Sequence, residues 1–199
     1  TDLGVFLDFN PVLSEQNQKR THILLAKIHP ELQHSVIEQN KNPKAVIVVD
    51  TMNLWIETTF SELKKVLTSS NILLINESES MLLTKRANIE NAAEELLGMG
   101  PEIVVIKKGS EGAELFSNRE TIKIGAFPVK EVIDPTGAGD VFAGTFIAAL
   151  AEKDSNQTAL LKASAMASFS IESFGVDRLI NLSDNDLTER IEYLKTSVK

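Results

Sequence analysis

Four short runs of apolar residues constrain the fold of this chain more than any other feature of its sequence. The runs read ILL, AVIVV, ILLI and IVVI and occupy residues 23–25, 45–49, 72–75 and 103–106. Each run is unbroken rather than alternating, and this pattern indicates a strand buried on both faces, as in a parallel sheet. Their spacing is close to the roughly 30 residues that one β-α-β unit occupies. The sequence therefore predicts an α/β fold built on a mostly parallel sheet.

Segments with helical patterns fill the gaps between these runs and continue beyond them. The predicted helices span residues 30–39, 61–67, 88–97, 139–153, 157–174 and 184–196. Pro30 suits a first helical turn, Ser61 is expected to cap its helix, and Gly175 is expected to end the helix before it. In the last predicted helix, Arg190 is expected on the polar side.

Two further segments, 112–117 and 120–127, predict a β-hairpin that turns around Asn118 and Arg119. With helices on both sides of the sheet, the predicted architecture is a three-layer α/β/α sandwich. No repeat, low-complexity segment or linker divides the sequence, so residues 1–199 are expected to form one domain.

Charge and composition argue against several classes of protein. Lys and Arg number 20 against 28 Asp and Glu, a net charge of -8, whereas nucleic-acid binding usually needs a basic face. Cysteine is absent, which excludes disulfides and thiolate chemistry. The start, TDLGVFLDFN, does not read as a signal peptide, and no apolar run approaches the roughly 20 residues of a membrane span. We therefore expect a cytoplasmic protein with no nucleic-acid or membrane partner.

Polar residues follow each predicted parallel strand. They are Lys27 and His29, then Asp50, Thr51 and Asn53, then Asn76 and Glu79, then Lys107, Lys108 and Gly109. In open parallel sheets, ligands bind outside the carboxyl ends of the strands. We therefore expect these groups to converge on one rim of the sheet.

A glycine loop, DPTGAGD at residues 134–140, leads into an apolar helix. Gly137, Ala138 and Gly139 precede helix N–H groups that have no internal partner, and such groups form an anion site. Asp140 would stand beside the anion, where it could accept a proton from a hydroxyl that attacks a phosphoryl group. The simpler alternative is that Asp140 caps the helix and the glycines make a tight turn.

The stretch DPTGAGDVFAG resembles the C-terminal signature of the ribokinase-like, or PfkB, family of sugar and nucleoside kinases. The resemblance implies that Asp140 is the catalytic base and that Gly137, Ala138 and Gly139 form the anion hole. It also implies that Asp134 and Thr136, in the same motif, contribute to the nucleotide site.

Two further elements carry the same resemblance. Residues 76–79 (NESE) match the family's NxxE element, which implies that Asn76 and Glu79 order Mg²⁺ and its waters. Residues 108–112 resemble its nucleotide-side KxGxxG turn, which implies nucleotide binding by Lys108, Gly109 and Gly112. For Glu79 and Lys108 the alternatives are an ordinary helix charge and a surface lysine.

The stretch 163–175 resembles the family's helix that closes over the nucleotide base. This resemblance implies a contact from Ala167, for which helix packing is the alternative. Residues 50–53 (DTMN) lie where the family often has an Asp-x-Asn-like strand end, and Asp50 could equally cap the next segment.

The resemblance implies ATP- and Mg²⁺-dependent phosphorylation of a hydroxymethyl group on a sugar or nucleoside. It leaves open a monovalent cation and a homodimer. It further implies that this chain is the nucleotide-binding part of such a kinase, without the first third that carries a Gly-Gly motif, much of the acceptor site and a β lid. The alternatives are a pyridoxal or hydroxymethylpyrimidine kinase of the same fold and a non-catalytic nucleotide-binding fragment.

Overall fold

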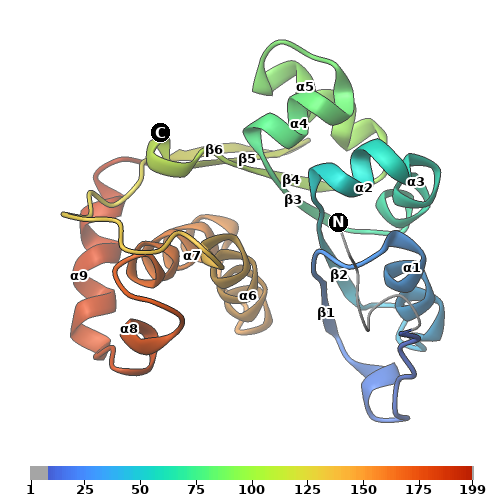
Figure 1. Cartoon of the computed structure of the whole chain (residues 1–199), viewed down its shortest axis with the longest axis horizontal. Helices are drawn as coiled ribbons and strands as arrows, with labels where there is room; N and C mark the ends of the chain where they lie inside the picture. The colour runs from blue at the N-terminus through green and yellow to red at the C-terminus, as the bar shows by residue number, and fades with distance from the viewer. Residues whose placement is uncertain (1–8, 199) are drawn as a thin grey trace.

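A computed structural model describes residues 9–198 of the chain, which form a sheet with helices on both faces (Figure 1). The first eight residues, on which most of the expectation about the start of the chain depends, lie outside the described residues. The strands are β1 (His22–Leu25), β2 (Val46–Asp50), β3 (Ile72–Asn76), β4 (Ile103–Lys107), β5 (Ala113–Ser117) and β6 (Thr121–Ile124).

The strands lie in the sheet in the order in which they occur along the chain. β1 to β4 are parallel, while β5 and β6 are antiparallel and close the sheet as a hairpin. The four predicted strands and the hairpin around Asn118 and Arg119 are confirmed. Because Asn76 pairs with Lys107 and Asp50 with Leu74, the polar carboxyl ends of the parallel strands meet at one edge.

Helices connect the strands and extend the chain after β6. They are α1 (Pro30–Gln39), α2 (Asn53–Thr58), α3 (Phe60–Thr68), α4 (Glu77–Thr84), α5 (Ile89–Gly98), α6 (Ala138–Ala151), α7 (Asn156–Ser170), α8 (Asp177–Ile180) and α9 (Asp184–Lys195), with short 3₁₀ turns at Asn17–Lys19 (η2) and Gly109–Glu111 (η3).

The sheet is buried on both faces, as the unbroken apolar runs predicted. Alternate strand residues such as Leu74 and Val105 pack with α6, α7 and Leu194 of α9. The residues between them, such as Leu73 and Val104, pack with α1 to α5 on the other face. Figure 1 shows these two groups of helices on opposite sides of the strands, so the three-layer sandwich is confirmed.

Helix α6 is placed by its own sequence. Its buried residues are Phe142, Ala143, Phe146 and Ala149, which share one helical face because they are three or four positions apart. The small residues on this face let α6 lie close to α7, which is also rich in alanine. The glycine loop therefore joins a helix that is firmly packed against the sheet.

Three local predictions are wrong. Ser61 does not cap α3, which begins at Phe60 after Thr59 without a side-chain cap. α7 ends at Ser170 rather than at Phe174. The Ile171 carbonyl accepts from the N–H groups of Ile133 and Asp134 in a neighbouring loop instead of from a further turn of the helix. Arg190 is buried, not on the polar side of α9.

No helix within residues 9–198 combines the length and the apolar character that crossing a bilayer requires.

Candidate active site

The loop before α6 is held in shape by hydrogen bonds at its base. The N–H groups of Ile133 and Asp134 both donate to the Ile171 carbonyl at the end of α7, at 2.8 and 3.3 Å. The Asp134 carboxylate accepts from the Thr136 N–H at 2.9 Å, and hydrogen bonding to Thr136 lowers the pKa of Asp134. These contacts give the predicted nucleotide-site residues Asp134 and Thr136 a structural part in the loop.

Gly137 turns the chain into α6. Its φ of 80° lies in the left-handed region that glycine adopts without a steric penalty. Among the described residues, no side chain caps the first turn of α6. The Ala138 N–H donates to the Pro135 carbonyl at 3.2 Å, whereas the N–H groups of Gly139 and Asp140 have no hydrogen-bond partner among the described residues and can receive an anion. Asp140 lies in the same turn and is exposed.

Two lysines approach the glycine loop from the strand ends. A Cβ atom added to Gly139 would lie 3.4 Å from Lys27 Nζ and 3.6 Å from Lys107 Nζ. Lys27 follows β1, and Lys107 ends β4. The loop, the start of α6 and both ammonium groups therefore border the same space, where positive charge and free N–H groups favour an anion.

Asp50, at the end of β2, is the buried partner of these lysines. Lys107 Nζ donates to both carboxylate oxygens of Asp50, at 3.2 and 3.0 Å, and Lys27 Nζ lies 3.9 Å from one of them. Burial raises the pKa of Asp50, although Lys107 and Lys27 oppose the shift; the charge of Asp140 adds to the rise. Asp50 and Asp140 are thus close enough to interact.

Asn76 and Glu79 form a reciprocal cap at the start of α4. Asn76 Oδ1 accepts from the Glu79 N–H at 2.8 Å, and Glu79 Oε2 accepts from the Asn76 N–H at 3.0 Å. Burial raises the pKa of Glu79, while the Asn76 N–H and Lys107 oppose the shift. The two predicted metal residues therefore have a structural role, and Glu79 lies within electrostatic reach of Lys107 and Asp50.

Lys107 is the last residue of β4, whereas Lys108 lies in the turn that leads into η3, and the two side chains take different partners. Lys108 Nζ lies 2.9 Å from the Glu114 carboxylate and turns away from the glycine loop. Gly109 and Gly112 both have positive φ, 58° and 98°. A Cβ on Gly112 would lie only 2.0 Å from the Ile124 carbonyl oxygen, so backbone packing alone requires glycine there.

Ala167, the predicted contact to the nucleotide base, packs against the α6–α7 core and is partly buried. The structure thus brings together Gly137, Ala138, Gly139, Asp140, Asn76 and Glu79 at one rim, whereas Lys108 is directed elsewhere.

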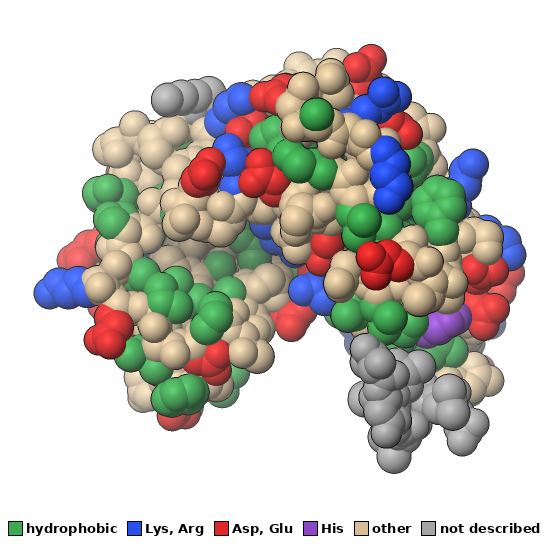
Figure 2. All heavy atoms as spheres, turned by 45° about the horizontal axis from the view of Figure 1, so that its top comes forward, with side chains coloured by type: hydrophobic (Ala, Val, Ile, Leu, Met, Phe, Trp, Pro, Cys, Tyr) green, Lys and Arg blue, Asp and Glu red, His purple; other side chains and the backbone are tan. Residues whose placement is uncertain are grey.

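The sequence interpretation did not select Lys27, Asp50 and Lys107 as site residues, although it placed them at strand ends. One available signal was the spacing of the K-x-G-x-x-G motif. When Gly109 and Gly112 are its glycines, its lysine is Lys107 and not Lys108. Figure 2 shows the surface hollowed between the two helical layers, with basic and acidic side chains close together there.

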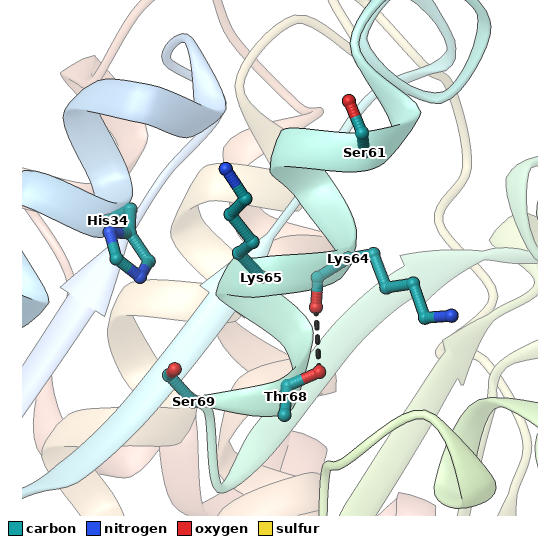
Figure 3. A pocket seen from close by; sticks show the side chains of 6 residues that line it. All are labelled: His34, Ser61, Lys64, Lys65, Thr68 and Ser69. Atoms are coloured by element: carbon teal, nitrogen blue, oxygen red, sulfur yellow. Dashed lines mark hydrogen bonds between the residues drawn. The ribbon is translucent and has the colours of Figure 1, made fainter.

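A separate pocket of about 390 Å³ lies between α1 and α3 (Figure 3). It is lined by His34, Ser61, Lys64, Lys65, Thr68 and Ser69. Thr68 and Ser69 precede β3, so the pocket extends toward the amino end of that strand, opposite the rim where the carboxyl ends meet. None of these lining residues belongs to the glycine loop at residues 134–140 or is one of Lys27, Asp50 and Lys107.

Comparison with known proteins gives one family. Residues 8–181 match the sequence model of the pfkB family of carbohydrate kinases. A cytidine kinase of Thermococcus kodakarensis is 32% identical over an alignment of 131 positions that covers 62% of this chain and 45% of that protein.

Solved structures show the same fold. The Arabidopsis thaliana ribokinase complexed with ribose and ATP aligns with a TM-score of 0.75 at 24% identity, covering 92% of this chain and 61% of that one. A putative ribokinase II of E. coli in complex with ATP and Mg²⁺ aligns with a TM-score of 0.73 at 27% identity, covering 88% and 58%. The chain therefore spans less than two thirds of these relatives.

Proposed function

The chain belongs to the pfkB family of carbohydrate kinases, and from this premise we propose that it is the nucleotide-binding part of an ATP-dependent kinase for a sugar or nucleoside hydroxyl. The observation that carries the proposal is the uncapped first turn of α6. That turn presents the unpaired N–H groups of Gly139 and Asp140 next to the ammonium groups of Lys27 and Lys107. Residues 1–199 would form one domain of the longer enzyme.

In this proposal Asp140 is the general base. It is exposed, and it lies one residue after Gly139, so a hydroxyl placed beside the glycine loop would reach its carboxylate. An aspartate in this position can accept the hydroxyl proton as the oxygen attacks phosphorus. The packed α6 fixes the distance between the base and the anion site, which is the positioning contribution to catalysis.

The unpaired N–H groups of Gly139 and Asp140, which follow the turn at Gly137, would stabilise charge that develops on the transferred phosphoryl group. Lys27 and Lys107 would add two positive charges on the facing side. Asp134 and Thr136 would keep the loop in shape through their mutual hydrogen bond. The nucleotide-side assignments of Lys108, Gly109, Gly112 and Ala167 stay predictions.

The donor set fits ATP with Mg²⁺. The described residues contain no group of three His, Cys, Asp or Glu side chains that could hold a metal, but Mg²⁺ on a nucleotide usually keeps several waters and needs few protein ligands. Glu79 Oε2 is used by the helix cap, which leaves Oε1 for such a water. Bound ATP with Mg²⁺ would supply the phosphoryl group and partly neutralise its charge.

The acceptor class follows from the relatives' names, which include a cytidine kinase, a nucleoside kinase and ribokinases. A panel of sugars and nucleosides, assayed for acceptor-dependent ADP formation, tests the proposal. The panel is run on the 199-residue chain and on the product of the complete reading frame. We expect one sugar or nucleoside to raise ADP formation well above the acceptor-free rate in the complete product. Absence of any such acceptor, with the protein folded and ATP bound, would contradict the proposal.

A further inference from the structure

Asp50 is almost completely buried, yet the two lysines that pair with it, Lys27 and Lys107, approach the glycine loop. The exposed fraction of its side chain is 1%, against 14% for Lys107 and 34% for Lys27. We propose that Asp50 is a positioning residue that holds the ammonium groups of Lys107 and Lys27 beside Gly139, where they form the cationic side of a polyphosphate site. The identity of the anion rests on the proposed function.

The ion pair restricts lysine side chains that would otherwise be mobile. A lysine side chain carries about 2 kcal/mol of rotamer entropy, and a free lysine spends little time in any one position. Lys107 donates to both oxygens of Asp50, so its Nζ has one fixed place next to the loop. Lys27 is paired at 3.9 Å only and is more exposed, so it can move toward an incoming anion.

The space between these lysines and the loop exists because residue 139 is glycine. The 3.4 and 3.6 Å separations from an added Cβ to Lys27 Nζ and Lys107 Nζ are ordinary contact distances. A side chain at this position would therefore occupy the space that the ammonium groups face. Glycine leaves it open to an anion that contacts the lysines and the start of α6 together.

Asp50 is itself held by the surrounding backbone. Gln33 of α1 is 1% exposed, and its Nε2 donates to the carbonyls of Ala26 and Asp50 at 2.7 and 3.2 Å. This side chain joins the end of β1, just before Lys27, to the end of β2. The backbone just before Lys27 is thus joined to the backbone of Asp50 by a buried hydrogen-bonded link, while the Lys27 side chain itself can still move.

Tripolyphosphate binding, measured by isothermal titration calorimetry on the 199-residue chain, tests the inference without needing an acceptor or turnover. Lys107→Met and Lys27→Met should each weaken binding about tenfold or more, as expected for loss of a charged hydrogen bond to phosphate. Lys64→Met removes an exposed lysine of α3 and should change binding less than about threefold. Lys108→Met distinguishes the two adjacent lysines and should weaken binding less than Lys107→Met does, because Lys108 Nζ is paired with Glu114.

Asp50→Asn separates positioning from simple electrostatics. If Asp50 were only a negative charge near the site, removing it would strengthen anion binding. Asparagine keeps one acceptor oxygen, but it loses the charge and replaces the second acceptor with an NH₂ donor, so it would hold the lysine ammonium groups less firmly. We therefore expect weaker tripolyphosphate binding, by about threefold or more, with Lys107→Met adding little further loss in the double variant.

Circular dichroism shows whether each variant is folded. If Asp50→Asn does not fold, Lys27→Met still tests the lysine side of the inference, because the Lys27 side chain is partly exposed. Wild-type chain that does not bind tripolyphosphate, dependence on Lys108 rather than Lys107, or tighter binding by Asp50→Asn would each overturn the inference. Lysine-dependent binding without kinase activity in the complete product would leave this inference standing and contradict the proposed function. Kinase activity in the complete product that Lys107→Met and Lys27→Met leave unchanged would contradict this inference and leave the proposed function standing.

Discussion

Replacing Arg190 should lower the stability of the chain far more than its place on the last helix suggests. Its guanidinium donates to Ser168 Oγ at 2.7 Å and to Glu172 at 2.6 Å, and it lies 3.4 Å above the centre of the Phe169 ring. Ser168 and Glu172 flank Ile171, whose carbonyl holds the base of the glycine loop. Arg190 therefore fixes the end of α7 on which the loop depends.

The magnitude follows from these contacts. Hydrogen bonds to charged groups are worth about 1.5–3 kcal/mol each, and a desolvated cation–π contact about 2 kcal/mol. Burial of the guanidinium offsets part of this stabilisation. Burial lowers the pKa of Arg190, and the hydrogen bond from Arg190 to Glu172 opposes that shift. Removing one partner of a buried pair costs about 3–5 kcal/mol, and we take the lower end because a quarter of the Glu172 side chain is exposed.

Urea unfolding followed by circular dichroism should give Arg190→Ala about 3 kcal/mol less stability than wild type, or a Tm lower by about 6–12 °C. Arg178→Ala is the matched control, because Arg178 lies 3.7 Å from the same Glu172 but is one third exposed, and it should cost about 1 kcal/mol or less. Equal losses in the two variants, or a loss below about 1 kcal/mol for Arg190→Ala, would refute this reasoning.

Gly112→Ala should destabilise the chain by at least about 2 kcal/mol, since its φ is positive and its Cβ would meet the Ile124 carbonyl, whereas Gly98→Ala, in open space at the end of α5, should be neutral or stabilising in the same melts. Burial alone would raise the pKa of Glu114, but ion pairs with two lysines outweigh it and hold the pKa below its ordinary 4.5. The stabilisation is therefore present above pH 4.5 and lost as the pH falls through the folded-state pKa, so Glu114→Gln should be less stable than wild type at pH 7 and approach it in acid; a difference that persists unchanged would contradict this sign. Glu79→Gln should raise the Mg²⁺ concentration for half-maximal ADP formation in the complete product, and an unchanged midpoint would leave Glu79 as a helix cap only.

The elements that the sequence predicted are those with local signals. Unbroken apolar runs marked β1 to β4, and Gly137 with the apolar residues after Asp140 marked the start of α6. Helices α2 and α4 were missed because they are short and begin directly after strand ends, where polar residues read as loop. Asn76 shows the difficulty, since one residue both ends β3 and caps α4.

Arg190 and the adjacent lysines show what local patterns leave out. Arginine usually lies on a surface, and only the fold brings Arg190 to Ser168 and Phe169. Lys107 and Lys108 are chemically identical, and only their places in the fold, at the end of β4 and in the turn after it, decide that Lys107 faces the glycine loop. Which face of β4 carries α6 depends on how the whole chain folds, and a local pattern does not show it.

The rate of phosphoryl transfer by Asp140→Asn, in the product of the complete reading frame with its best acceptor, tests the central claim most directly. Asparagine keeps the shape of the loop but cannot accept the proton, so kcat should fall by about 10²–10⁴-fold while the affinity for an ATP analogue stays within about threefold. Glu131→Gln, which removes an exposed carboxylate from the same loop, should leave kcat within about twofold of wild type. A kcat for Asp140→Asn within a few-fold of wild type would contradict the assignment of Asp140 as the base, and with it the mechanism proposed for this site.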